Sequence, residues 1–230
     1  MFKILHNVLS AEECAEMRNQ LQQGTWIEGA ATAGALAKQV KQNLQLDDQD
    51  PIAKRLSQQV EQRLLANPDF ISSALPNRFY PPKFNLYQHG GFYGAHVDNA
   101  LLTNPYSGEK LRADLSATLF LNAPESYVGG ELQIDTGMGV QEIKLPAGDL
   151  ILYDSGALHQ VLPVTEGQRI ASFMWVQSLI ADSKARSLLN QLDQTIQNLR
   201  RERDDRVQDE NVLQLTELYH NLLRYWSQTG

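Results

Sequence analysis

In residues 1–77, apolar residues recur at helical spacing in two places, with short strand-like runs around them. An apolar run at 2–9 predicts a strand. Ser10 and Glu13 then form a capping box, in which each side chain satisfies a backbone N–H at the start of a helix. We expect this helix to end near Gln23, and we expect the whole N-terminal region to supply helices and strands that pack on a central domain.

A second amphipathic helix is expected after Asp50 and Pro51, which supply an N-cap and a first-turn proline. Between the two helices, the stretch 25–36 is rich in Gly, Ala and Thr and predicts one strand followed by a flexible loop. The prolines of 71–82 predict a loop there. The apolar face of the second helix consists of Ile52, Leu56, Val60 and Leu64.

From position 83 the pattern changes to short apolar runs separated by turn residues, which is typical of β-structure. The glycines at 137 and 139 predict a hairpin between two of these runs. Eight such runs predict a double-stranded β-helix, or jelly roll, in residues 78–178. The predicted strands are 83–88, 92–98, 113–122, 130–136, 140–145, 149–154, 159–164 and 169–177.

After Ser178 the helical spacing returns, interrupted by a charged stretch at 200–206. Residues 179–230 are therefore predicted to form a helical hairpin, and the fold class is α+β, mainly β. The alternating charge signs at 200–206 favour a solvated turn over a basic docking patch. The apolar stripe of the hairpin requires burial, either on the central domain or in a homo-oligomer formed through these helices. Its residues are Leu188, Leu192, Ile196, Leu199, Leu215, Leu218, Leu222 and Trp226.

Charge and cysteine content narrow the classes of partner and compartment. A net charge of −7 creates no overall field that attracts a phosphate backbone, so nucleic acid is not expected as a partner. No apolar stretch approaches the roughly 20 residues of a membrane-spanning helix, so no membrane partner is expected either. The N-terminus lacks the features of a signal peptide, and the single cysteine, Cys14, cannot form an internal disulfide. A cytoplasmic location is the expectation.

The candidate chemistry lies in the stretch FNLYQHGGFYGAHVD at 84–98. Residues two apart on a strand point to the same side, so His96 and Asp98 can converge. His159, the only histidine downstream before His220, is the candidate third ligand. Two imidazoles and one carboxylate on one side of a metal leave the opposite positions open, which is the facial triad of non-haem Fe(II) oxygenases.

Arg169 lies ten residues after His159, at the start of an apolar strand. A guanidinium buried in the mouth of a β-barrel requires an anion, and its planar fork suits a carboxylate bound through two hydrogen bonds. Arg169 therefore suggests an acidic cosubstrate. The alternative is an arginine on the strand surface, which the flanking apolar Ile170 and Phe173 disfavour.

These four residues, in this order and with these loop lengths, resemble the Fe(II)/2-oxoglutarate-dependent dioxygenases. Within that group they resemble the prolyl 4-hydroxylase branch, and most closely the bacterial PKHD-type hydroxylases, over residues 78–178. The resemblance implies a hydroxylase that oxidises a C–H bond while 2-oxoglutarate becomes succinate and carbon dioxide. It also implies that Fe(II) is chelated by 2-oxoglutarate, that the distal carboxylate pairs with Arg169, and that ascorbate is the reductant.

The resemblance also implies roles for residues around the pocket. Tyr87 corresponds to a tyrosine that hydrogen-bonds the cosubstrate in relatives, and simple packing is the equally weighted alternative. Tyr93 either packs or lies near the substrate entrance. Phe120 stands where some relatives have a tyrosine that assists the distal carboxylate, and a phenyl ring cannot donate a hydrogen bond. Another helper is then needed, and Thr118 is the candidate.

Other side chains close to the triad in sequence have supporting roles or none. Asp154 and Ser155 are candidates to orient the second imidazole of the triad, since ligating histidines usually have such partners. Trp175 is expected to pack beside the iron site. His89 lies in a Gly-rich loop and His220 lies on the last helix, so neither is expected to bind the metal.

Two other functions use the same residues, and the substrate is open. A non-catalytic, cupin-like sensor of iron or 2-oxoglutarate predicts binding without turnover. A zinc hydrolase uses similar ligands but leaves Arg169 without a role, so we rank it last. The substrate is either a small molecule or a peptidyl group. The loop 99–112 directly follows Asp98 and is the candidate lid that selects it.

Overall fold

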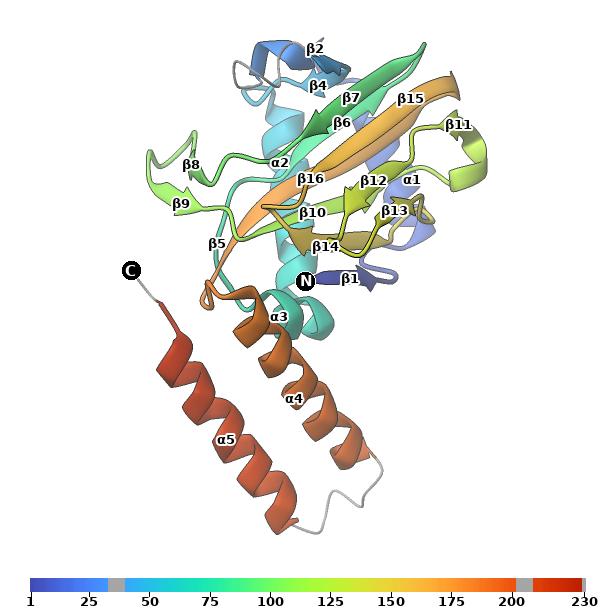
Figure 1. Ribbon diagram of the computed structural model, residues 1–230. Coiled ribbons are helices and arrows are strands. Elements are labelled where there is room, and N and C mark those ends of the chain that lie inside the picture. Colours follow the sequence, from blue (N-terminus) through green and yellow to red (C-terminus); the bar gives the residue numbers. More distant parts are fainter. Residues whose placement is uncertain (33–39, 202–208, 229–230) are drawn as a thin grey trace.

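Two antiparallel β-sheets face each other in the computed structural model, which describes residues 1–32, 40–201 and 209–228 (Figure 1). The larger sheet has the order β1 (Phe2–Leu5), β14 (Leu150–Asp154), β10 (Leu115–Phe120), β16 (Arg169–Ser178), β6 (Lys83–Tyr87), β4 (Leu44–Leu46) and β2 (Trp26–Glu28), with β5 (Pro76–Phe79) beside β16. The smaller sheet has the order β13 (Val140–Ile143), β12 (Leu132–Asp135), β15 (His159–Gly167), β7 (Gly91–His96) and β3 (Lys41–Gln42), with β11 (Tyr127–Gly129) beside β15.

Successive residues of the central strands point to opposite sides of the larger sheet, so one side packs under the helices and the other faces the smaller sheet. In β10, Leu115 and Leu119 belong to the core beneath the helices, whereas Phe120 belongs to the cluster shared with the smaller sheet. In β16, Ile170 joins the helical side, and Arg169 contacts the ring of Phe120. Because successive strand residues point to opposite sides, the same strands anchor the helices and present polar groups to the space between the sheets.

Helices α1 (Ala11–Leu21) and α2 (Pro51–Leu65) pack on the outer face of the larger sheet, where their buried residues join its core. The predicted capping box is present, since Ser10 accepts from the N–H of Glu13 and Glu13 accepts from the N–H of Ser10. The predicted cap of α2 is also present, because the Asp50 carboxylate accepts from the N–H of Ile52. Both helix predictions are confirmed.

The loop predicted for 71–82 is present only at 80–82, and the prediction is wrong for 71–79. Helix α3 (Pro68–Ala74) begins at Asn67, whose side chain accepts from the N–H of Phe70, and it ends at Leu75 in the left-handed conformation. Strand β5 follows directly and pairs with β16. Of the prolines on which the prediction rested, Pro76 was misleading, because the first residue of a strand is a position that tolerates proline.

The short strands near the N-terminus were only partly predicted. The strand expected in 25–36 is β2, followed by a 3-10 turn at Gly29–Thr32. The flexible loop expected after it falls largely on residues 33–39, outside the described part of the chain. Strands β3 and β4 had no prediction, because a strand of two or three residues is too short to show alternation.

The eight strands predicted after position 83 correspond to eight strands of the two sheets. Strand β7 ends at His96, so Asp98 lies just beyond the strand. The structure adds β11, which follows a 3-10 turn at Pro124–Ser126. The segment 99–112 is more ordered than the predicted loop, because β8 (Leu101–Thr103) and β9 (Lys110–Arg112) form a two-stranded arm.

The predicted C-terminal hairpin consists of α4 (Ser183–Arg201) and α5 (Glu210–Trp226), which extend away from the sheets (Figure 1). Trp226 of the predicted stripe packs on the cluster of Leu75 and Leu189, a residue outside that stripe. Leu188 and Leu218 of the predicted stripe are exposed, so the stripe is buried only in part. Most of the charged turn predicted at 200–206 lies outside the described residues. No helix in the described ranges is long and apolar enough to cross a membrane.

Candidate active site

Two neighbouring strands of the smaller sheet bring the predicted triad together. Strands β7 and β15 run antiparallel with His96 directly opposite His159, so the end of one strand meets the start of the other. Asp98 lies two residues beyond, and its carboxylate oxygens are 4.0 Å from Nε2 of His96 and 3.7 Å from Nε2 of His159. One candidate ligand atom from each residue lies within 4.8 Å of the others.

Hydrogen bonds to the main chain orient both imidazoles. Nδ1 of His96 lies 2.8 Å from the carbonyl oxygen of Gly94, and Nδ1 of His159 lies 3.0 Å from that of Ala157. A carbonyl only accepts, so each Nδ1 carries the proton and donates it, which leaves the lone pair of Nε2 for a ligand. The donor set of two Nε2 atoms and one carboxylate therefore fits a divalent transition metal.

Electrostatics keep His96 neutral, as a metal ligand must be. Burial, followed by the nearby His159, lowers the pKa of His96 to about 4. The His96 ring also stacks on the ring of Tyr93 at a centroid distance of 3.6 Å. The prediction that Tyr93 either packs or lies near an entrance thus resolves to packing against a triad imidazole.

The Asp98 carboxylate is held by serines of the larger sheet. The hydroxyl of Ser116 donates to Oδ2 of Asp98 at 2.6 Å, and the hydroxyl oxygens of Ser116 and Ser155 are 2.8 Å apart. Ser155 therefore supports the triad through Asp98 and not through His159, which corrects the predicted role. The role of Ser116 was not predicted, because one serine in an apolar strand gives no signal of its partner.

Asp154 does not orient His159 either. Its carboxylate pairs with the guanidinium of Arg186 at 2.8 Å and with the amino group of Met1, and it accepts from Ser183. These contacts tie α4 and the N-terminus to β14. The prediction for Asp154 is wrong because its side chain points to the opposite side from the buried Tyr153, toward the helical hairpin.

Arg169 is buried to 1% exposure between the rings of Tyr87 and Phe120. The guanidinium carbon lies 5.3 Å from the first ring centroid and 5.0 Å from the second. None of its three nitrogens has a carboxylate or carbonyl acceptor among the described residues, and a polar group beside the guanidinium is the hydroxyl of Tyr127. A buried cation without an acceptor costs free energy, so this pocket fits a carboxylate.

The predicted helpers of Arg169 have different positions. Tyr87 is buried, its hydroxyl lies 3.4 Å from the amide nitrogen of Asn85, and burial raises its pKa to about 12. Thr118 faces the hydroxyl of Tyr153. The hydroxyl beside Arg169 is that of Tyr127, whose pKa is raised by burial and lowered by the guanidinium. Tyr127 was not predicted, because it lies on the short strand β11 outside the regular pattern.

The remaining predicted residues lie where expected or away from the triad. Trp175 lies opposite Ser116 in the sheet register, so it is on the side of the triad, and its ring packs edge-on against Tyr80 and Phe173. His89 lies in the exposed turn before β7. His220 is exposed on α5.

Comparison with known proteins identifies the kind of enzyme. Residues 82–177 match the 2OG-Fe(II) oxygenase superfamily, and residues 183–228 match the PKHD-type hydroxylase C-terminal domain. A PKHD-type hydroxylase of Acidovorax ebreus is 52% identical over 225 residues, which cover 97% of each protein. The chain belongs to the PKHD-type hydroxylase family. A second family member, from Teredinibacter turnerae, is 48% identical to this hydroxylase over 99% of both proteins.

The fold of this PKHD-type hydroxylase is similar to that of solved oxygenases. A Pseudomonas putida prolyl-4-hydroxylase superposes with a TM-score of 0.52 at 22% identity, covering 77% of this chain and 92% of that one. An oxidoreductase of the 2OG-Fe(II) oxygenase family from Burkholderia pseudomallei gives a TM-score of 0.55 at 16% identity, covering 76% and 84%. At these identities the likeness concerns the fold alone.

Family membership confirms the predicted enzyme class. The PKHD-type hydroxylase is a 2OG-Fe(II) oxygenase, so Fe(II) and 2-oxoglutarate are the cofactors that the family implies. The non-catalytic sensor and the zinc hydrolase are thereby disfavoured. The structure adds that the three triad side chains and a buried guanidinium without a carboxylate partner among the described residues occur together in one chain.

Proposed function

We propose that His96, Asp98 and His159 hold Fe(II), and that Arg169 binds the distal carboxylate of 2-oxoglutarate. The convergence of the three side chains and the main-chain hydrogen bonds at both Nδ1 atoms support the metal. When bound, Fe(II) and 2-oxoglutarate supply the oxidising chemistry by which the enzyme hydroxylates a C–H bond of its substrate and releases succinate and carbon dioxide.

The observation that carries this proposal is the buried guanidinium of Arg169, which has no carboxylate partner among the described residues. Removing a cation from water without supplying an acceptor is unfavourable, and a carboxylate can accept two of its N–H groups at once. The hydroxyl of Tyr127 lies beside the guanidinium of Arg169, within hydrogen-bonding reach, and has no other partner among the described residues. We assign to Tyr127 the role that was predicted for Thr118, which is to assist Arg169 in binding the distal carboxylate. Tyr87 packs on the guanidinium from one side.

The protein's own contribution is to orient groups and to exclude water. Ser116 fixes the Asp98 carboxylate, and the two main-chain carbonyls fix the imidazoles. Tyr153 is close to both the triad and Arg169. The charges of Asp98 and Arg169 both affect the pKa of its hydroxyl, and its ring lies edge-on to His159. With Phe120 it forms an apolar wall that keeps water from the cosubstrate.

The finer features that accompany this function are also proposals. The two facing antiparallel sheets support a double-stranded β-helix for residues 78–178, flanked by an N-terminal region at 1–77 and a helical hairpin at 179–230. Ascorbate is the proposed reductant, and the substrate is a small molecule or a peptidyl group. The exposed apolar side chains of Leu188, Leu213 and Leu218 support a homo-oligomer through the hairpin.

Anaerobic titration with Fe(II) and 2-oxoglutarate tests the proposal. We expect a visible charge-transfer band from the chelated keto acid in the wild-type protein and none in the His159→Ala variant. His89→Ala is the matched control, since His89 is exposed and makes no contact with the triad. A band that survives in His159→Ala, or that disappears in both variants, would exclude the assigned metal centre.

A further inference from the structure

A second cationic side chain, Lys41, lies near the triad, next to the ring that stacks on His96. It belongs to β3, the edge strand of the smaller sheet, and pairs in register with Tyr93 of β7. Its Nζ lies 5.1 Å from the centre of the Tyr93 ring, and that ring stacks on His96. Lys41 is therefore one aromatic ring removed from a proposed metal ligand.

The charge of Lys41 has no carboxylate partner. Its Nζ lies 3.4 Å from the amide oxygen of Gln45, and no carboxylate of the described residues lies within ion-pair distance. Lys83 of β6, in the larger sheet, does have a carboxylate partner, because its Nζ lies 2.6 Å from the Asp48 carboxylate. Burial, and then Lys83, lower the pKa of Lys41 to about 8, so the ammonium form still predominates at neutral pH.

A partly open aromatic surface adjoins this ammonium group. The Nζ of Lys41 lies 6.0 Å from the ring centre of Phe173, which packs edge-on against Trp175, and Trp175 packs edge-on against Tyr80. All three rings are half-buried, unlike the enclosed rings around Arg169. Trp175 lies opposite Ser116, the residue that holds Asp98, so this surface lies on the side of the triad.

The two cations lie in separate environments and therefore serve separate anions. Arg169 is enclosed by Tyr87, Phe120 and Tyr127, and its pocket fits the distal carboxylate of the cosubstrate. Lys41 is half-buried at the sheet edge, and the charges that act on it are those of Lys83, Asp98 and Asp48. One 2-oxoglutarate molecule with its distal end at Arg169 leaves Lys41 without an anionic partner.

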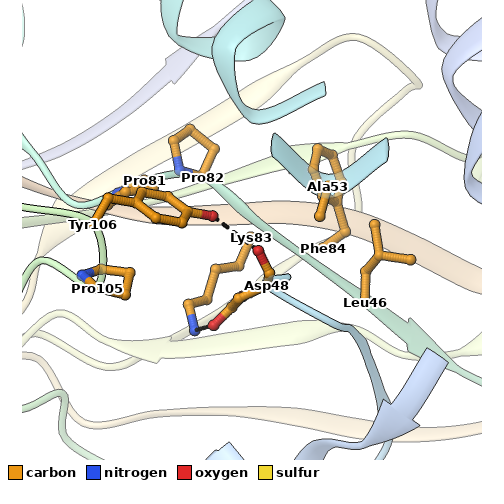
Figure 2. Close-up of a pocket in the computed structure, with 9 residues that line it drawn as sticks. All are labelled: Leu46, Asp48, Ala53, Pro81, Pro82, Lys83, Phe84, Pro105 and Tyr106. Carbon is orange, nitrogen blue, oxygen red and sulfur yellow. Dashed lines mark hydrogen bonds and ion pairs between the residues drawn. The ribbon is translucent and has the colours of Figure 1, made fainter. Parts of the chain in front are cut away.

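The small pocket beyond Lys83 does not supply the anion site (Figure 2). It holds about 10 Å³, enough for about one water molecule, and Lys83 already pairs there with Asp48. The hydroxyl of Tyr106, from the tip of the two-stranded arm, donates to the carbonyl oxygen of Asp48 at 3.0 Å and closes that side. The candidate surface beside Lys41 is therefore that of Phe173 and Trp175.

We propose that Lys41 binds a carboxylate of the prime substrate, and that the apolar part of the same molecule rests on Phe173 and Trp175. The inference rests on the proposed function, because it places the substrate beside the proposed metal centre. It narrows the substrate to an anionic molecule with a flat apolar portion next to its charge. An ammonium and aromatic faces are the groups that recognise such a molecule.

The test uses the full chain loaded with Ni(II), which does not support turnover, and saturated with 2-oxoglutarate. Calorimetry then compares benzoate with benzamide, and cyclohexanecarboxylate with its amide, as probes that differ only in charge. We expect the wild-type protein to bind each carboxylate about tenfold more tightly than its amide, which is the effect of one charge-assisted hydrogen bond.

Three variants assign the preference to Lys41. Lys41→Met keeps the apolar stem and should bind acid and amide equally, whereas Lys41→Arg keeps the charge and should keep the preference. Lys54→Met removes the same charge from an exposed position on α2 and should behave as the wild type. The affinity for 2-oxoglutarate, measured first in each sample, should stay within about twofold throughout.

The outcomes separate this inference from the proposed function. Absence of 2-oxoglutarate binding in the wild type would overturn the proposed function. With 2-oxoglutarate bound, three results would overturn the role of Lys41: no carboxylate binding up to about 50 mM, equal binding of acid and amide, or a preference that survives in Lys41→Met. Loss of 2-oxoglutarate affinity in Lys41→Met would place Lys41 in the cosubstrate site, and would overturn it as well.

Discussion

The two cations that flank the triad differ in enclosure and in how the chain positions them. Arg169 lies in a central strand of the larger sheet, is 1% exposed and is enclosed by aromatic rings. Lys41 lies on a two-residue edge strand and is half-buried beside rings that remain partly open. The enclosed site accepts one ligand of defined size, whereas the open site can accommodate molecules of different shape. We therefore propose the first site for the cosubstrate and the second for the substrate.

The largest effect is expected when the enclosed cation, Arg169, is replaced by a neutral residue. In Arg169→Met the distal carboxylate loses its charge-assisted hydrogen bonds, and we expect the dissociation constant of 2-oxoglutarate to rise about 100-fold. The stability of the protein without ligands should not fall, because the variant removes a buried charge that has no carboxylate partner among the described residues. Calorimetry and thermal unfolding measure the two effects.

Arg186→Met is the matched control, because Arg186 is equally buried at 1% exposure but is paired with Asp154. Its removal leaves two main-chain carbonyls without their donor and takes from Asp154 one of its donors, beside Met1 and Ser183, so we expect a loss of about 1–3 kcal/mol in stability. The 2-oxoglutarate affinity should stay unchanged. Equal losses of cosubstrate affinity in both variants would show that Arg169 acts through the fold and not through the ligand.

The next largest effect is expected at the carboxylate of the triad. Ser116→Ala removes the hydroxyl that donates to Asp98, and loss of such an orienting hydrogen bond typically lowers metal affinity about tenfold or more. Ser155→Ala removes the hydroxyl one step further away and should have a smaller effect. Competition with a metal-sensitive dye measures both affinities. An effect of Ser155→Ala that exceeds that of Ser116→Ala would contradict this order.

A third, smaller effect is expected at the glycine that makes room for Arg169. Gly130 has a φ of +70°, and an added Cβ would lie 2.7 Å from a methyl of Val164 and 3.0 Å from Cδ of Arg169. Gly130→Ala should therefore weaken 2-oxoglutarate binding about fivefold and destabilise the protein by about 1–3 kcal/mol.

Gly137→Ala is the control that separates the cost of backbone strain from the cost of the steric contact at Gly130. Gly137 has a φ of +77°, but an added Cβ would meet nothing within 4 Å. This variant should show only the strain, about 1 kcal/mol, and no change in 2-oxoglutarate affinity. Similar cosubstrate affinities in the two alanine variants would show that Gly130 does not shape the Arg169 pocket.

The enclosed half of the site was largely predictable from the sequence. His96 and Asp98 are two residues apart near a strand end, and His159 and Arg169 each begin an apolar run, so a local pattern indicates every one of them. The resemblance to the dioxygenases then joined these local signals into one site.

The rest depended on contacts between segments far apart in the sequence. Ser116 reaches Asp98 from the opposite sheet, and Tyr127 reaches Arg169 from a three-residue strand. Lys41 approaches the triad only because β3 adds to the edge of β7. Asp154 was misassigned for the same reason, since its distance from His159 in sequence says nothing of its partner Arg186. Spacing indicates which residues share a face, and it does not indicate which strands become neighbours.

The smallest expected effect concerns the arm on the open side. At the tip of the arm, the hydroxyl of Tyr106 donates to the carbonyl oxygen of Asp48, and the ammonium of Lys54 lies 5.5 Å from the centre of the Tyr106 ring. Tyr106→Phe removes the first contact and keeps the second. An exposed neutral hydrogen bond contributes about 0.5 kcal/mol, so amide hydrogen exchange in β8 and β9 should accelerate about twofold. Exchange in β7 and β15, which position the triad, should not change, because the arm pairs with neither strand. If exchange in β7 accelerated as much as in the arm, the open side would be coupled to the enclosed one, and the division between the two would fail.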